Sequence, residues 1–132
     1  MNMKTELASL VGISTFTALL WIPYVLNRMV VSGIAATVGY PVNPPPLAPW
    51  AQRLRAAHAN AVENLVVFAA LILTAQVLGI STPVTAMAST LYLWSRVVHA
   101  ITYALRVPWL RTLAFVGGFA AQMMIAWQLL GA

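Results

Sequence analysis

The sequence predicts an all-α integral membrane protein, a four-transmembrane-helix bundle in which residues 1–132 form a single domain. The first observation is composition, because 61% of the residues are hydrophobic and only 7% are charged. In soluble domains about 25% of residues are charged. The second observation is length, since four apolar runs approach the roughly 20 residues that a helix needs to cross a bilayer. The third is that proline and glycine, which end helices, separate these runs.

The first predicted helix covers about residues 7–31, with a kink expected at Pro23. The following segment, residues 32–49, holds Gly33, Gly39 and then a run of consecutive prolines. This composition opposes a helix and favours a stiff, extended chain. We therefore expect a proline-rich connector between the first two helices.

Three further helices are expected after the connector. The second covers about residues 50–78 and is polar only in its first half. A short turn with a helix-start signal leads to the third helix at about residues 83–106. Pro108 separates it from the fourth helix at about residues 109–130. With an even number of spans, both termini lie on the same side of the membrane.

The distribution of cationic residues predicts the orientation of this bundle. Lys4 is the one basic residue on the side of the termini, and the loop between the second and third helices carries no charge. The other side receives the arginines Arg28, Arg53, Arg55, Arg106 and Arg111. Cytoplasmic loops are enriched in Lys and Arg. We therefore expect the proline-rich connector to be cytoplasmic, with both termini on the non-cytoplasmic side.

Composition also argues against several classes of function. The formal net charge is +5, but the basic residues are scattered among apolar runs, which opposes nucleic-acid binding. The chain has no cysteine, so any thiol reaction requires a thiol supplied by a ligand. Two histidines without cysteine or aspartate oppose a metal site. No serine is placed as a nucleophile beside a histidine and an acid.

One face of the second predicted helix is polar. At about 100° per residue, a common face holds four of its polar residues, namely Arg53, Asn60, Glu63 and Asn64. A charged residue deep in lipid costs at least about 2.5–3.5 kcal/mol, so other helices must surround this face and bury Glu63. Four short helices form only a thin shell, which suggests an oligomer. His58 projects from the other side, either as a structural hydrogen-bonding residue or as part of a site.

A second polar stripe lies on the third predicted helix. Its members have the spacing of a single face, and they are Arg96, His99, Tyr103 and Arg106. Because the second and third helices are antiparallel, this stripe lies at the level of Arg53, where Arg111 also opens the fourth helix. The opposite leaflet offers little polarity beyond Ser9, Gln76, Gln122 and Gln128.

This asymmetry distinguishes between classes of membrane protein. A transporter or channel needs polar groups through the full thickness of the membrane, whereas these helices are polar in one half. The pattern favours a blind pocket that opens to the cytoplasm and to lipid. Arginines can hold carboxylates in bidentate fashion. Several arginines with one acid therefore suit an anionic ligand that also carries an ammonium group.

Two segments carry a family resemblance. The first reads RLRAAHANAVEN from Arg53 to Asn64, and the second reads RVVHAITY from Arg96 to Tyr103, followed by VPWLRT. Both resemble the signature blocks of the MAPEG family, the membrane-associated proteins in eicosanoid and glutathione metabolism. Four spans and a proline-bearing first loop also agree with this family. The resemblance covers essentially the whole chain and is greatest to small bacterial members.

The resemblance implies a homotrimer in the bacterial inner membrane, with glutathione as co-substrate between adjacent subunits near the cytoplasmic face. The expected glutathione-binding residues are Arg53, Asn60, Glu63, Arg96, His99 and Tyr103. Glu63 matches the residue that meets the amino group of the peptide. Arg111 matches an arginine that activates the thiol, and Arg28 loosely matches an arginine of the first helix near the site. The implied activity is that of a transferase or peroxidase acting on lipophilic electrophiles or hydroperoxides from the bilayer.

One position departs from the family pattern. The eicosanoid-forming members carry an arginine seven residues before the glutamate, where this chain has Ala56. Arg55 is adjacent, but it points about 100° round the helix. Ala56 favours an alternative function, a non-catalytic membrane protein that binds an anionic lipid headgroup or a protein partner in the same pocket. The arrangement of the other pocket residues favours the enzyme.

Overall fold

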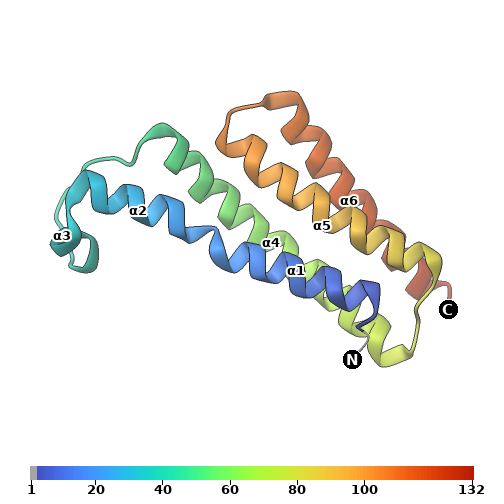
Figure 1. The fold of residues 1–132 in the computed structure, drawn as a ribbon. Coiled ribbons are helices and arrows are strands. Elements are labelled where there is room, and N and C mark those ends of the chain that lie inside the picture. The colour runs from blue at the N-terminus through green and yellow to red at the C-terminus, as the bar shows by residue number, and fades with distance from the viewer. Residues whose placement is uncertain (1–2) are drawn as a thin grey trace.

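The computed structural model describes residues 3–132, and this range is helical without a strand. Its helices are α1 (Thr5–Leu19), α2 (Trp21–Ser32), α3 (Ile34–Val38), α4 (Pro49–Leu78), α5 (Pro83–Ala104) and α6 (Pro108–Leu130). Helices α1 and α2 follow one another as one long rod, and α4, α5 and α6 pack beside it (Figure 1). The start of α1 and the end of α6 lie at the same end of the bundle (Figure 1).

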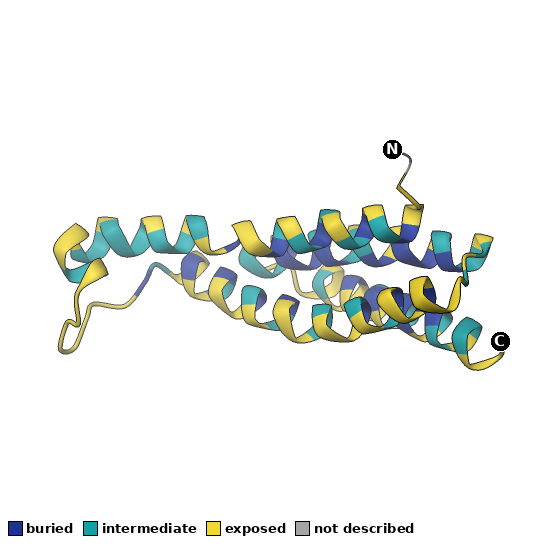
Figure 2. Ribbon diagram, turned by 90° about the horizontal axis from the view of Figure 1, so that it is seen from below, coloured by how far each residue is buried: buried dark blue, intermediate teal, exposed yellow. Residues whose placement is uncertain are grey.

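Three segments are long and apolar enough to cross a membrane, namely Thr5–Ser32, Pro49–Leu78 and Pro108–Leu130. Helix α5 has 22 residues, but its hydroxyl-bearing residues, Arg96 and His99 are spread along it, so it lacks an apolar stretch like those of the three spans. Exposed residues run along the outer faces of the bundle (Figure 2), and many of the exposed residues are large and apolar. Val77 and Leu130 are each 85% exposed. Such wide apolar exposure is costly in water and is expected of a protein surrounded by lipid.

The first predicted helix is broken near the kink expected at Pro23, and its two parts together still form one candidate span, Thr5–Ser32. Helix α1 ends at Leu19 and α2 begins at Trp21, with Leu20 between them. Pro23 has no N–H to donate, and its ring crowds the carbonyl four residues earlier, at Leu19. The break therefore lies one turn before the proline.

The connector also differs from the expectation of an extended chain over residues 32–49. Residues Ile34–Val38 form the short helix α3, because the prolines lie further on and leave these residues free to coil. Gly33 begins the turn with φ of +82°, a left-handed conformation that favours glycine. Only the part after Gly39 runs without helix to the start of α4.

Proline marks the first turn of α4, α5 and α6, at Pro49, Pro83 and Pro108. The missing N–H costs nothing at this position because the first N–H groups of a helix have no intrahelical partner. Helix α5 ends at Ala104, two residues earlier than expected. Arg106 follows with φ of +62°, and the N–H of Val107 donates to the carbonyl of Thr102. A non-glycine residue in this left-handed position is strained by about 1–2 kcal/mol.

The core forms where α1, α4, α5 and α6 meet. Phe68 of α4 stacks on Tyr92 of α5, with ring centroids 3.9 Å apart and planes 10° from parallel. Helices α5 and α6 approach closely at Gly117, where an added Cβ would lie 2.7 Å from Oγ of Ser95. Small residues permit such close contact between membrane helices.

A buried acid lies at the terminal end of the bundle, where the sequence predicted little polarity. Glu6 is 5% exposed, and its Oε1 accepts hydrogen bonds from Oγ1 of Thr85 at 2.7 Å and Oγ of Ser81 at 2.9 Å. Thr85 also forms a reciprocal capping box with Thr82 at the start of α5. Nearby, Oγ1 of Thr82 bonds to Oε1 of Gln128 on α6. These contacts tie α1 and α6 to the start of α5.

We predict that Thr85→Val destabilises the bundle by about 1–3 kcal/mol, because it removes one donor from the Glu6 carboxylate and opens the capping box. The free energy of unfolding can be measured by chemical denaturation in detergent micelles, followed by circular dichroism. Thr90→Val is the matched control, because the Thr90 hydroxyl is exposed and bonds only to Ala86 of its own helix. Equal stability of both variants would contradict the role given to Thr85.

Candidate functional site

The centre of the candidate site is a buried arginine on α5. Arg96 is 2% exposed, and its NH2 group donates a hydrogen bond of 2.6 Å to Oδ1 of Asn60 on α4. Its Nε is also buried but has no hydrogen-bond partner within the described residues. The guanidinium carbon lies 5.9 Å from the ring centroid of Phe115 on α6. A buried cation with an unused donor indicates a place for an anionic or hydrogen-bonding ligand.

One turn further along α5, His99 is 3% exposed. Its ring lies between two aromatic rings, with centroids 5.7 Å from Tyr103 and 6.0 Å from Phe115. Nδ1 of His99 is buried and has no hydrogen-bond partner in residues 3–132. Buried polar atoms are usually hydrogen-bonded. His99 therefore adds a second polar atom that a ligand could satisfy.

A cavity of about 240 Å³ adjoins these groups. Its walls come from three helices and consist of Asn60, His99, Tyr103, Arg111, Thr112 and Phe115. The guanidinium of Arg111 stacks over the ring of Tyr103, with its central carbon 5.1 Å from the ring centroid. This contact holds the Arg111 charge at the mouth of the cavity.

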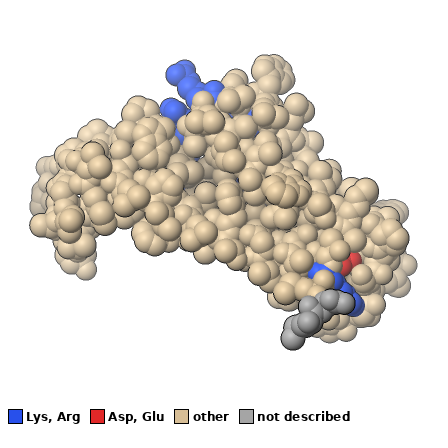
Figure 3. Space-filling view, in the orientation of Figure 1, with Lys and Arg blue, Asp and Glu red and all other residues tan. Residues whose placement is uncertain are grey.

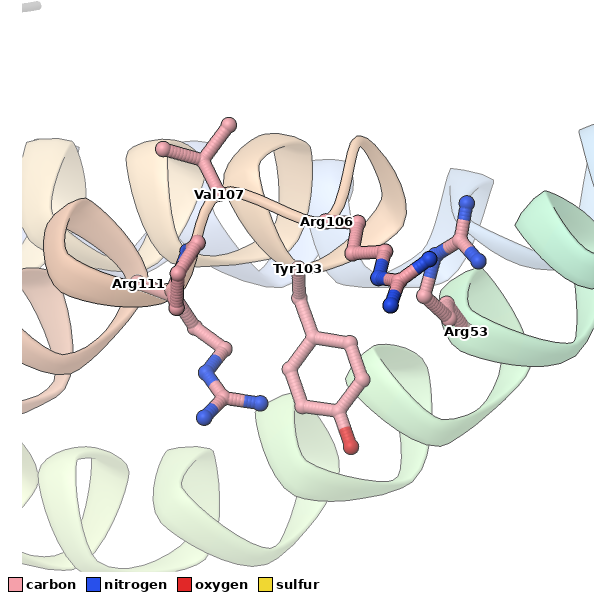
Figure 4. A pocket seen from close by; sticks show the side chains of 6 residues that line it. Arg53, Tyr103, Arg106, Val107 and Arg111 are labelled. Atoms are coloured by element: carbon pink, nitrogen blue, oxygen red, sulfur yellow. The ribbon is translucent and has the colours of Figure 1, made fainter.

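A second cavity of about 300 Å³ lies next to the first, and Tyr103 and Arg111 line both. Figure 4 shows its remaining cationic residues, Arg53 and Arg106, whose side chains point toward each other. Nε of Arg53 donates a hydrogen bond of 2.9 Å to the carbonyl oxygen of Ala104. Arg53 therefore lines the second cavity, whereas Asn60 lines the first.

Within this chain Glu63 does not join these residues, and its burial against other helices stays a prediction that involves a neighbouring subunit. It is exposed, and no hydrogen bond or ion pair links it to another residue in the part of the chain that the structure describes. A step of three residues turns a helix by about 300°, so Glu63 lies about 60° beyond Asn60, further from α5. The side chain faces outward near the middle of α4.

The cavities are strongly cationic because four arginines line or border them and no acid does. Figure 3 shows two small groups of charged atoms far apart on a surface that is otherwise uncharged, and one of these groups holds only Lys and Arg atoms in this view. The cavity residues Arg53, Arg106 and Arg111 are all cationic. An anion entering the cavities would meet cationic charge without a competing carboxylate from this chain.

Two residues left open by the sequence have structural partners. Nδ1 of His58 lies 2.7 Å from the hydroxyl oxygen of Tyr24, which links α2 to α4. Arg28 donates to the carbonyl oxygen of Pro45 and so holds the proline-rich connector. Conversely, sequence reasoning missed Phe115 and Thr112 as wall residues. Phe115 follows Arg111 by four positions, which is one helical turn, and this spacing could have revealed it.

Comparison with known proteins gives one family. The model of the MAPEG family matches residues 11–131, nearly the whole chain. None of the curated proteins compared matches the chain. The match includes every residue that lines the two cavities.

We predict that Asn60→Leu lowers the free energy of unfolding by about 2–3 kcal/mol, because the buried guanidinium of Arg96 loses the oxygen that accepts from it. Asn60→Asp is the matched control, since a carboxylate keeps an acceptor oxygen at the same place. Thermal unfolding in detergent, followed by tryptophan fluorescence, measures both. An unchanged melting temperature for Asn60→Leu would show that Arg96 does not depend on this bond.

Proposed function

The chain belongs to the MAPEG family, and on this ground we propose that it is a membrane-bound, glutathione-dependent transferase or peroxidase. In this proposal the protein activates the thiol of glutathione toward lipophilic electrophiles or hydroperoxides from the bilayer. The observation that carries the proposal is the pair of buried, unpartnered polar atoms, Nε of Arg96 and Nδ1 of His99, beside a cavity that opens next to Arg111.

The donor set fits glutathione. The peptide carries two carboxylates, one ammonium group and one thiol. Arg53 lines one cavity, and Arg96 is buried behind Asn60, which lines the adjoining one, so in this proposal the two guanidinium groups meet two separate carboxylates. Asn60 and Tyr103 offer hydrogen bonds between them, and Nδ1 of His99 offers a further one. Glu63, in this proposal, accepts the ammonium group at a subunit boundary.

Arg111 is the proposed thiol partner. Its guanidinium stands over Tyr103 and lines both cavities, so negative charge on a sulfur atom there would be stabilised. A nearby cation lowers the pKa of a thiol and increases the thiolate fraction. The phenol of Tyr103 can donate a hydrogen bond to the same atom. The aromatic ring of Phe115 and the surrounding apolar helix faces keep water away from the sulfur.

The exposed Glu63 supports an oligomer, which we propose to be a homotrimer. A carboxylate near the middle of a membrane-crossing helix is costly against lipid, and the described part of the chain offers it no partner. Ala56 and Ala59 share its exposed face, and small residues allow a second backbone to come close. A neighbouring subunit would cover Glu63 and complete the glutathione site.

The proposed membrane arrangement has four spans. Helix α5 contacts each of the other three rods, so neighbouring helices screen its polar residues, and its 22 residues are long enough to cross. The arginine-rich end is proposed to face the cytoplasm of a bacterial cell. Both termini then lie on the non-cytoplasmic side of the inner membrane.

We predict that glutathione binds saturably to the purified protein in detergent and that Arg53→Ala and Glu63→Gln each weaken binding. Both variants remove a charged partner of the peptide, so a loss of about tenfold or more is expected for each. Isothermal titration calorimetry measures the affinity. Arg55→Gln is the control, because Arg55 lines neither cavity. Absence of binding at millimolar glutathione in the unaltered protein would overturn the proposal and leave the non-catalytic alternative.

We predict that Arg111→Gln lowers kcat toward a generic electrophile by about a hundredfold while the affinity for glutathione changes little. The reason is that Arg111 is proposed to stabilise negative charge on the sulfur atom. This charge is larger in the transition state than in the bound, protonated thiol. Conjugation assays and calorimetry on the same preparation separate the two quantities. An equal loss of turnover and binding would contradict the role given to Arg111.

A further inference from the structure

An apolar groove runs along the face of α5 that is turned away from His99. It has a volume of about 240 Å³ and is bounded by Phe16, Leu20, Pro23, Leu54, Ile101 and Leu105. Its floor includes the small side chains of Ala100 and Ala104. Two features leave this space open. The helical rod of α1 and α2 breaks at Leu20, and the α5 side of the groove carries the small side chains of alanine.

The groove ends beside cationic groups. Leu105 lines the groove, and the next residue, Arg106, is exposed and lines the arginine-rich cavity. Ala104 lines the groove as well, and its carbonyl oxygen accepts the hydrogen bond from Arg53. Figure 4 shows the guanidinium groups of Arg53 and Arg106 close together at this point. The apolar groove therefore ends next to two cationic side chains, those of Arg53 and Arg106.

Arg106 is held in an unusual backbone conformation. Its φ of +62° is in the left-handed region, where glycine or asparagine is the common choice after a helix. Three residues further along the chain, Trp109 at the start of α6 is 80% exposed. Exposed tryptophans mark the membrane–water interface, where lipid headgroups lie.

We propose that this groove binds one acyl chain of an anionic phospholipid whose phosphate is held by Arg106. The apolar lining suits a hydrocarbon chain, and the unpaired guanidinium at its end suits a phosphate, so one amphiphilic molecule satisfies both. A helix from a second copy would match the apolar lining but not the cationic end. The groove lies on the other face of α5 from the proposed glutathione site, and the two sites adjoin at Arg106, which follows Leu105 of the groove and also lines the arginine-rich cavity.

The test titrates phosphatidylglycerol into the detergent-purified protein and counts bound lipid by native mass spectrometry. Phosphatidylcholine with the same acyl chains and free glycerol phosphate serve as comparison probes. Arg106→Gly removes the charge and suits the left-handed backbone, so the fold is retained. Ala104→Leu fills the groove. The matched controls are Arg55→Gln, which removes one arginine elsewhere, and Ala120→Leu, which adds the same bulk on α6 away from the groove.

We expect one phosphatidylglycerol per chain, binding about fivefold weaker in Arg106→Gly and lost in Ala104→Leu, with both controls unchanged. Lipid binding is measured without glutathione, which keeps this test independent of the proposed function. Ala104→Leu should bind glutathione as the unaltered protein does, because Ala104 lines neither cavity of the proposed glutathione site. Equal binding of phosphatidylcholine, equal binding of free glycerol phosphate, or unchanged lipid binding in either test variant would overturn the proposal. Because the chain has no cysteine, Ile101→Cys offers a clean check, and a disulfide between two chains at this position would show a second copy in the groove.

Discussion

The arrangement of the bundle depends on keeping one guanidinium, that of Arg96, inside a protein surrounded by lipid. Within the described residues its charge is met by one amide oxygen, from Asn60, and a poorly paired buried charge costs several kcal/mol. The helices close round it accordingly. At Gly118 of α6 an added Cβ would lie 3.2 Å from Cδ of Arg96, so a larger residue would press on the arginine. The position of α5 in contact with all three other rods follows from the same need.

The other polar residues of the site lie in line with Arg96, between it and the arginine-rich end of the bundle. His99 and Tyr103 follow Arg96 on the same face of α5, and Arg111 meets Tyr103 from α6. Helices α5 and α6 therefore each contribute an arginine and an aromatic side chain to the surroundings of the cavity. The opposite face of α5 carries Ala100 and Ala104 at matching heights, so one helix separates a polar cavity from an apolar groove. The lipid and glutathione proposals concern these two faces.

The sequence predicted the helix starts well because proline defines them locally, at Pro83 and Pro108 among others. It also predicted that Asn60, His99, Tyr103 and Arg111 come together, since helical spacing fixes which residues share a face. The spacing of residues along one helix does not show which face of that helix the neighbouring helices cover. Glu63, for example, is exposed within the single chain, and its burial in an oligomer stays a prediction. The break at Leu20 and the helix at α3 depend on backbone geometry over several residues, which composition alone does not resolve.

The two acids of the chain show how an ionisable group can be accommodated in such a bundle. Glu6 is satisfied within the chain, because the hydroxyls of Ser81 and Thr85 donate to it at the end of the bundle. Glu63 faces outward from α4, and Arg96 faces inward from α5, so the chain cannot join them without turning α4 about its axis. Such a rotation would expose Asn60 and leave Arg96 without its oxygen. Within the described residues neither charge has a partner of opposite sign, and under the proposed function glutathione at a boundary between subunits would supply a carboxylate to Arg96 and an ammonium group to Glu63.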